Sequence, residues 1–239
     1  MHRRAFLAGV ATAAVAGCLG GNGSGGGTTA SDGSGGDPAT DGNGSGGDAG
    51  SDLATNPGAA GLAGQPTLGP APTDAGAVIV AFEDPSCPTC RRFEETTFPE
   101  IRSQWTDAGR ASFVFRCYPI IYPWGKPAVQ ALEAVYARDA ATFWTLKDYY
   151  YRTQSAFDAS NVLDRTERFI AANTDLDAAA VVADARQKRY DDAVQADLDA
   201  GKASGFSATP SFLLFRDGAF VTSLTGAKSF SVFQNALQL

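Results

Sequence analysis

The chain has 239 residues, enough for one well-packed domain with appended segments, and its formal net charge at pH 7 is −7. This charge excludes nucleic acid as a partner, because an acidic protein cannot neutralise a run of phosphates. The single histidine is His2, which lies in a segment that we expect processing to remove. Histidine-dependent hydrolysis and histidine-ligated metal sites are therefore excluded in their usual forms, and we expect neither a metal nor a cofactor.

Residues 1–17 have the pattern of an export signal. Arg3 and Arg4 precede an apolar run of about a dozen residues, which is too short to span a bilayer. The arginine pair resembles a twin-arginine signal, and residues 15–18 resemble a lipobox, in which cleavage leaves Cys18 as the lipidated first residue. We therefore expect a protein anchored through Cys18 at the outer face of the cytoplasmic membrane. The alternative is a plain signal peptide that contains a chance cysteine.

Residues 18–64 are rich in glycine, serine and aspartate and have almost no large apolar side chain. Such a segment cannot bury enough surface to offset the entropy of ordering it, so we predict a disordered tether. Order is expected to begin near Gln65. Asn22 and Asn43 each begin an Asn-Gly-Ser triplet that fits the N-glycosylation pattern, and the use of either site stays open.

Four later segments are predicted strands, because each is an apolar run of strand length: residues 77–82, 112–116, 211–215 and 219–223. The first has the continuous apolar character of a buried central strand. The last two flank Asp217-Gly218, and an Asp-Gly pair between two such runs predicts a hairpin.

Helices are predicted between and after these strands. One begins around Cys87 and should bend at Pro99. A long helical stretch follows from about residue 127 to residue 203, with Ser160 and Asp175 as expected helix caps. Its breaks are expected near Ala140, Ser155–Ser160, Asn173 and Gln187. A short helix over about residues 230–239 closes the chain.

The order of these elements is strand, helix, strand, helical block, hairpin, helix. It indicates one α/β domain over residues 65–239. A helical insertion at about residues 126–203 separates the N-terminal βαβ part from the closing hairpin and helix.

Cys87 and Cys90 form a Cys-x-x-Cys motif directly after the first predicted strand. A thiol in the first turn of a helix faces unpaired N–H groups and the positive end of the helix dipole, which both favour the thiolate. Pro88 suits that turn because its missing N–H would have no helical partner. A redox-active pair is the favoured interpretation, and a purely structural disulfide is the alternative. Zinc is disfavoured, because the only other thiols are Cys18 and Cys117.

Residues 82–93, together with Phe98-Pro99-Glu100, resemble the DsbA-like branch of the thioredoxin superfamily. The similarity extends through the helical block to residues 208–212. It implies a thioredoxin-like fold in which Cys87 is the nucleophile that carries the mixed disulfide and Cys90 is the resolving thiol. Support for the active site would come from the residues between and facing the cysteines: Pro88, Thr89, Thr209 and Pro210. Pro210 would be a cis-proline that faces the pair, and Thr209 would offer its backbone to an extended substrate.

The sequence departs from that family at three places, one of which is minor: Ala208 stands where a glycine is common. Relatives often carry a buried acid six residues before the first cysteine, where Ala81 stands here. Glu83 or Asp84 could replace this acid, and the sequence does not show which side chain points inward. The Pro-Thr pair between the cysteines also lacks the histidine that DsbA carries there, which leaves the redox direction open.

The resemblance and the export signal together predict an extracytoplasmic thiol–disulfide oxidoreductase. Its expected role is to oxidise thiols of exported proteins or peptides through a Cys87–Cys90 disulfide, because reducing pools are absent outside the membrane. An unidentified redox partner would regenerate the disulfide. One alternative is a reductase or isomerase, for example in cytochrome maturation. Another is an anchored binding module in which the pair is only structural.

Two further features have a packing interpretation and a functional one. Cys117 is predicted to be a buried, inert thiol at a strand end, and the alternative is a third redox thiol. An aromatic group in the helical block is predicted to pack the insertion against the sheet, and the alternative is a peptide groove. Its members are Phe143, Trp144, Tyr149, Tyr150 and Tyr151.

Overall fold

The computed structural model describes residues 52–239. The predicted export signal, the lipidation site Cys18, the two glycosylation triplets and most of the predicted tether lie outside the described residues. Within residues 52–239 the chain forms a five-stranded sheet of order β1-β3-β2-β4-β5. The strands are β1 (Thr67–Leu68), β2 (Ala77–Glu83), β3 (Ser112–Cys117), β4 (Ser211–Arg216) and β5 (Ala219–Thr225). β2 and β3 are parallel, and the other neighbouring strands are antiparallel.

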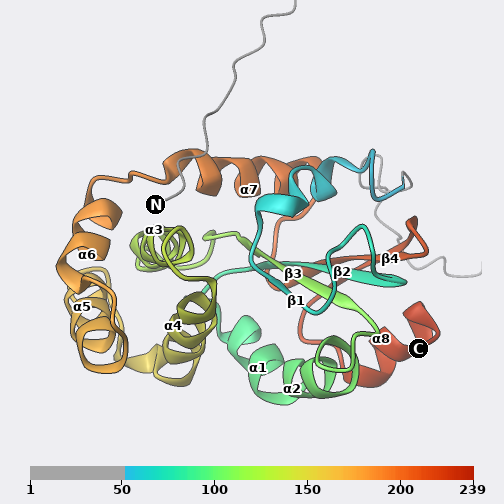
Figure 1. The fold of residues 1–239 in the computed structure, drawn as a ribbon, viewed down its shortest axis with the longest axis horizontal. Helices are drawn as coiled ribbons and strands as arrows, with labels where there is room; N and C mark the ends of the chain where they lie inside the picture. Colours follow the sequence, from blue (N-terminus) through green and yellow to red (C-terminus); the bar gives the residue numbers. More distant parts are fainter. Residues whose placement is uncertain (1–51) are drawn as a thin grey trace, which may run out of the picture. The chain divides into compact units, whose positions relative to one another are not determined.

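Helices cover both faces of this sheet. Figure 1 shows α1, α2 and α8 on one face and α7 on the other, with α3 to α6 gathered to one side. The α-helices are α1 (Pro88–Thr96), α2 (Phe98–Ile101), α3 (Gly125–Tyr136), α4 (Ala140–Arg152), α5 (Val162–Asn173), α6 (Ala178–Arg186), α7 (Asp191–Ala203) and α8 (Phe230–Leu237). Shorter turns are η1 (Pro57–Ala59), η2 (Leu62–Gly64), the π-helical η3 (Arg102–Thr106) and η4 (Gln154–Ala156). This is a thioredoxin-like α/β fold with a helical insertion, as the sequence predicts.

Side chains of β2 alternate between two apolar layers, which confirms the prediction of a buried central strand. Ile79 and Ala81 pack in the layer that contains α1, α2 and α8. Val78, Val80 and Phe82 pack in the opposite layer, beside α7 and η1. Since successive side chains of a strand point to opposite faces, both layers are anchored on the same short segment.

The prediction that the tether extends to residue 64 is wrong for residues 52–64. Leu53 and Leu62 pack into the apolar layer beside α7, and the Leu53 N–H donates to the Gly218 carbonyl at 2.8 Å. The composition of this segment suggested disorder, but small residues let its backbone approach the domain closely. A Cβ added at Gly58 would lie 2.1 Å from the Ser204 Oγ. The absence of a side chain at Gly58 is therefore what allows the backbone of this segment to approach Ser204.

The breaks expected in the helical block coincide with the ends of α3 to α6, but two expected caps are wrong. α5 begins after Asn161, and the Asp158 carboxylate accepts from the Ser160 N–H in the preceding loop. Asp177, not Asp175, caps α6 by accepting from the Ala180 N–H at 3.0 Å. Several aspartates, serines and asparagines stand before each helix, so the sequence offers more candidate caps than the helix uses.

The two local signals at Pro99 and Asp217-Gly218 are confirmed. Helix α1 ends at Thr96, and Pro99 lies in the first turn of α2, because proline disfavours a continuous helix through the residues before it. Asp217 and Gly218 both have positive φ angles, 50° and 81°, as a tight hairpin turn between β4 and β5 requires.

Candidate active site

Both cysteines lie at the start of α1, shortly after the end of β2. Cys87 is the N-cap residue of this helix, with extended backbone angles, and its sulfur accepts from the Cys90 N–H at 3.5 Å. Pro88 occupies the first turn, where no N–H is required. The turn before the helix is fixed by Asp84, whose carboxylate accepts from the N–H of Ser86 at 2.8 Å and from its hydroxyl at 2.7 Å. Cys87 is thereby held at the helix N-terminus.

The segment before β4 lies against this pair. The Cys87 thiol donates to the Thr209 carbonyl oxygen at 3.2 Å, and the Thr209–Pro210 peptide bond is cis. The Thr209 hydroxyl is buried and finds no hydrogen-bond partner among residues 52–239. It is therefore available to donate to the sulfur once Cys87 is ionised.

The two thiols differ sharply in acidity. The pKa of Cys87 is lowered to about 6, chiefly by a hydrogen bond from the Cys90 thiol, with smaller contributions from the Thr209 side chain and the N–H groups of Cys90 and Thr89. The pKa of Cys90 is raised well above its ordinary value, mainly by burial, then by its hydrogen bond to Cys87 and by the charge of Glu83. At neutral pH, Cys87 is the thiolate and Cys90 keeps its proton. Both are free and buried, so this is the dithiol form.

Glu83 is the acid that points inward beneath the cysteines. It is fully buried at the end of β2, and its Oε2 accepts from the Tyr151 hydroxyl at 3.1 Å. Its Oε1 has no hydrogen-bond partner within the described part of the chain. Burial, followed by the charge of Glu94, raises the pKa of Glu83 well above its ordinary value. Asp84 is also buried, but its carboxylate is occupied by the turn and by the Ile121 N–H at 2.8 Å.

A buried lysine completes this site. Lys147 on α4 is fully buried, forms an ion pair with Glu94 on α1, and lies over the Phe98 ring with its Nζ 4.1 Å from the ring centroid. Helices α1 and α4 contact one another at this point (Figure 1). The sequence reasoning missed Lys147, although a lysine on an otherwise aromatic helix face was a usable signal. We call the following residues the redox cluster: Cys87, Cys90, Glu83, Glu94, Lys147 and Tyr151.

A second buried group surrounds Cys117, and we call Cys117, Glu133, Asp197 and Arg116 the Cys117 cluster. Ligand atoms of the first three lie within 4.8 Å of one another. The Arg116 Nη1 lies 2.6 Å from the Asp197 Oδ1, so a guanidinium supplies positive charge to these acids. Burial, followed by the charge of Glu133, raises the pKa of the Cys117 thiol well above its ordinary value. Burial and a raised pKa favour the inert interpretation of this thiol.

The aromatic group of α4 packs the insertion against the sheet, as predicted. Phe143 and Trp144 lie 5.6 Å and 6.3 Å from Phe115 on β3, measured between ring centroids. Tyr151 differs from the other members, because it packs against Cys87 and Cys90.

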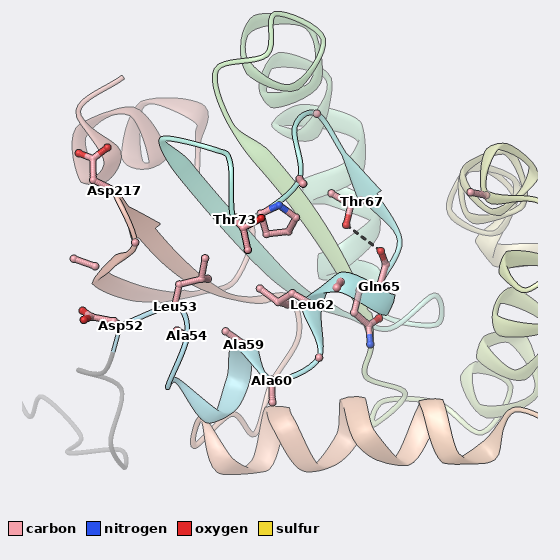
Figure 2. Close-up of a pocket in the computed structure, with 18 of the residues that line it drawn as sticks. Asp52, Leu53, Ala54, Ala59, Ala60, Leu62, Gln65, Thr67, Thr73 and Asp217 are labelled. Carbon is pink, nitrogen blue, oxygen red and sulfur yellow. Dashed lines mark hydrogen bonds between the residues drawn. The ribbon is translucent and has the colours of Figure 1, made fainter. Parts of the chain in front are cut away.

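The loop after β3 presents apolar side chains next to the turn formed by residues 84–87, which we call the redox turn. Ile120, Ile121 and Tyr122 are exposed, and they make up three of the four large exposed apolar residues in the described part of the chain. The loop is held in place because the Ser86 hydroxyl accepts from the Tyr122 N–H at 3.0 Å. A cavity of about 970 Å³ lies elsewhere, lined by residues 52–73 and by the β4–β5 turn (Figure 2). None of the three described cysteines lines it.

Comparison with known proteins supports the same fold. A family model described as thioredoxin matches residues 65–236. Disulfide bond formation protein D of Bacillus subtilis is 32% identical over 91 residues, which are 38% of this chain and 40% of that protein. The chain spans less than half the length of the curated disulfide bond formation proteins that it matches.

Solved structures extend the likeness to nearly the whole folded part. Oxidised BdbD from Bacillus subtilis has a TM-score of 0.64 at 20% identity, covering 74% of this chain and 92% of that one. The α-DsbA1 protein from Wolbachia pipientis has a TM-score of 0.61 at 19% identity, covering 72% of this chain and 87% of that one. These TM-scores establish a shared fold. Between residues 52 and 239, every helix is too short or too polar to cross a membrane.

Proposed function

Because the chain belongs to the thioredoxin family, we propose that it is a thiol–disulfide oxidoreductase in which Cys87 is the reacting thiol and Cys90 the resolving thiol. The observation that carries the proposal is the difference in acidity between the two thiols. Cys87, with a pKa of about 6, is a thiolate at neutral pH, whereas burial keeps Cys90 protonated. A purely structural disulfide needs no such difference between the pKa values of its two thiols.

In the proposed reaction the enzyme begins with a Cys87–Cys90 disulfide. A substrate thiolate attacks the Cys87 sulfur, which forms a mixed disulfide and releases Cys90 as a thiolate. Cys90 then takes a proton, and the Glu83 carboxyl is placed to supply it because burial raises the pKa of this acid and so favours its protonated form. A second substrate thiolate attacks the substrate sulfur of the mixed disulfide and releases Cys87 as a thiolate. The substrate thereby loses two electrons to the enzyme, and an external oxidant must restore the disulfide.

The low pKa of Cys87 supports oxidation as the direction of this reaction. Stabilising the thiolate stabilises the reduced enzyme, and a stabilised reduced form makes the disulfide a stronger oxidant. A thiol pKa of about 6 lies between the values typical of DsbA, about 3.5, and thioredoxin, about 7. We therefore expect a reduction potential between about −120 and −270 mV. Titration against glutathione tests this, and a potential at or below the thioredoxin value would favour the reductase alternative.

The proposed substrates are cysteine-containing exported proteins or peptides in an unfolded state. The exposed loop Ile120–Tyr122 offers apolar contacts beside the redox turn, and unfolded chains expose apolar side chains. The Thr209 backbone, next to Cys87, is placed for an extended segment of the substrate.

We further propose export and anchoring through a lipid on Cys18, on the strength of the sequence signals. Labelling with a radioactive fatty acid tests the anchor, because Cys18→Ala should abolish incorporation.

The role of each cysteine can be tested by trapping the intermediate. In Cys90→Ser the Cys87 thiolate should attack a disulfide-containing peptide, release one peptide thiolate and accumulate as a stable mixed disulfide, because the resolving thiol is missing. Cys87→Ser should form none. Mixed disulfides are separated on non-reducing gels and located by mass spectrometry. Trapping through Cys90 in the Cys87→Ser variant would contradict the assigned roles.

A further inference from the structure

A side chain from the helical insertion reaches into the redox turn. Gln154 is the first residue of η4, in the connection between α4 and α5, and only 8% of its surface is exposed. Its Nε2 donates to the Pro85 carbonyl at 2.8 Å and to the Cys87 carbonyl at 3.0 Å. These carbonyls lie on either side of Ser86. One amide group therefore holds both ends of the turn that places Cys87.

The peptide unit between Cys87 and Pro88 depends on a side-chain donor such as Gln154 more than most peptide units do. The next residue is Pro88, so this unit has no N–H, and the Cys87 carbonyl is its only hydrogen-bonding group. That carbonyl accepts from Gln154 and, at 3.1 Å, from the Arg91 N–H in the first turn of α1. Its direction sets the backbone angle at Cys87. The same angle places the sulfur next to the Cys90 N–H and the Thr209 carbonyl.

We propose that Gln154 is a positioning residue that holds the Cys87 sulfur at the N-terminus of α1, so that the helical insertion sets the reactivity of the redox pair. The inference rests on the proposed role of Cys87 as the reacting thiol. A second contact from the same end of the insertion supports it, since Tyr151 on α4 donates to Glu83 at 3.1 Å. The insertion thus contacts the pair on the Cys87 side through Gln154 and on the Cys90 side through Tyr151.

Substitutions of Gln154 can test this proposal without changing the charges around the two cysteines. The titratable groups packed around the pair are Glu83 from β2, Asp84 from the turn before Cys87, Glu94 from α1, and Tyr151 and Lys147 from α4. Gln154 carries no charge, so Gln154→Leu removes the two hydrogen bonds, keeps most of the packing volume and leaves these side chains in place. Gln154→Met keeps the unbranched shape instead, and its thioether carries neither a donor nor a charge.

The experiment is the pH profile of Cys87 alkylation by iodoacetamide in the reduced full-length protein. In Gln154→Leu we expect the apparent pKa of Cys87 to rise by about 0.5–1 unit, and alkylation well below pH 6 to slow by about three- to tenfold. The glutathione titration should give a more negative potential, because the thiolate is less stabilised. Gln154→Met should raise the pKa by a similar amount, and it provides the measurement if the leucine variant does not fold.

Two matched controls separate positioning from general stability. Ser155→Ala changes an exposed neighbour in the same turn and should alter neither profile nor potential. Tyr150→Phe removes a buried hydrogen bond of the insertion, 2.7 Å from the Tyr150 hydroxyl to the Thr166 Oγ1, and should lower the unfolding temperature only. The proposal is overturned if Gln154→Leu and Gln154→Met behave like Tyr150→Phe, with an unchanged Cys87 pKa. Alkylation needs no substrate turnover, so this result is distinguishable from failure of the proposed oxidoreductase activity.

Discussion

The redox cluster and the Cys117 cluster are built from similar parts and have opposite consequences for their thiols. Each places a buried cysteine close to carboxylates and includes a buried cation, Lys147 in the first and Arg116 in the second. Yet the pKa of Cys87 falls to about 6, whereas the pKa of Cys117 rises well above its ordinary value. Neither neighbouring acids nor a nearby cation therefore decide whether a buried thiol reacts.

Hydrogen-bond donors make the difference. Cys87 is an N-cap residue, so N–H groups of the first turn of α1 and the Cys90 thiol donate to its sulfur. Cys117 ends a strand, where its own N–H is given to the Asp197 carboxylate at 2.7 Å. Burial is the main cause of its raised pKa, and the charge of the neighbouring Glu133 carboxyl adds to it. A helix start supplies donors to a sulfur, and a strand end in a paired sheet does not.

The largest expected contrast is in activity. Cys87→Ser should abolish oxidation of a model dithiol, because serine cannot form the disulfide. Cys117→Ala should leave the rate within about twofold, because a buried thiol with a raised pKa takes no part in exchange. Steady-state oxidation of a fluorescent dithiol peptide measures both. A large loss in Cys117→Ala, with an unchanged unfolding curve, would make Cys117 a redox thiol after all.

The next contrast is in stability. Asp197→Ala leaves the fully buried Arg116 charge without its carboxylate and removes the acceptor of the Cys117 N–H. Removing one partner of a buried ion pair costs about 3–5 kcal/mol of unfolding free energy. Urea unfolding measures this loss. The apparent pKa of Cys87 should stay near 6 in the same variant, and a shift there would mean that the two clusters are coupled.

A third contrast lies in how stability depends on pH. In the reduced protein the pKa of Cys87 is about 6, against 9.0 as its ordinary value, so between these values the unfolded chain binds the proton and the folded chain does not. The contribution of Cys87 to stability should therefore rise by about 2–4 kcal/mol as the pH goes from 6 to 9, and it is lost again as the pH falls back to 6. Cys117 has the opposite sign, because its raised pKa lowers stability only above pH 9. Urea unfolding at a series of pH values should show the rise in Cys117→Ala but not in Cys87→Ala.

The sequence predicted the elements that carry strong local signals. Continuous apolar runs gave the buried strands, Asp217-Gly218 gave the hairpin turn, and the Cys-x-x-Cys motif gave a helix N-terminus at Cys87. Each of these depends on residues close together in the chain. Residues 52–64 were mispredicted because their packing depends on a distant surface, which Ser204 and other residues of the domain provide.

The surroundings of the cysteines were harder to predict for the same reason. Lys147 and Gln154 reach the site from the helical insertion, far along the chain from Cys87. Their direction depends on how the insertion packs, which no local pattern determines. From the sequence, either Glu83 or Asp84 could be the buried acid beside the cysteines. The sequence does not distinguish them, because their environments differ only in the folded protein: the Tyr151 hydroxyl lies beside Glu83 and loop N–H groups lie beside Asp84.

That choice leads to the smallest expected effect, in Glu83→Gln. Burial raises the pKa of the Glu83 carboxyl above its ordinary value of 4.5. Above pH 4.5 the unfolded chain therefore releases a proton that the folded protein keeps, so this carboxyl makes the wild-type protein less stable as the pH rises. Glutamine keeps the shape and never ionises, so the variant should be more stable than the wild type at pH 7 and equally stable near pH 4. Its exchange rate should fall less than in Cys87→Ser, because only the proton for Cys90 is lost. Urea unfolding and stopped-flow exchange at both pH values measure these effects. Asp84→Asn is the matched control, and a rate loss confined to that variant would assign the proton to Asp84 instead.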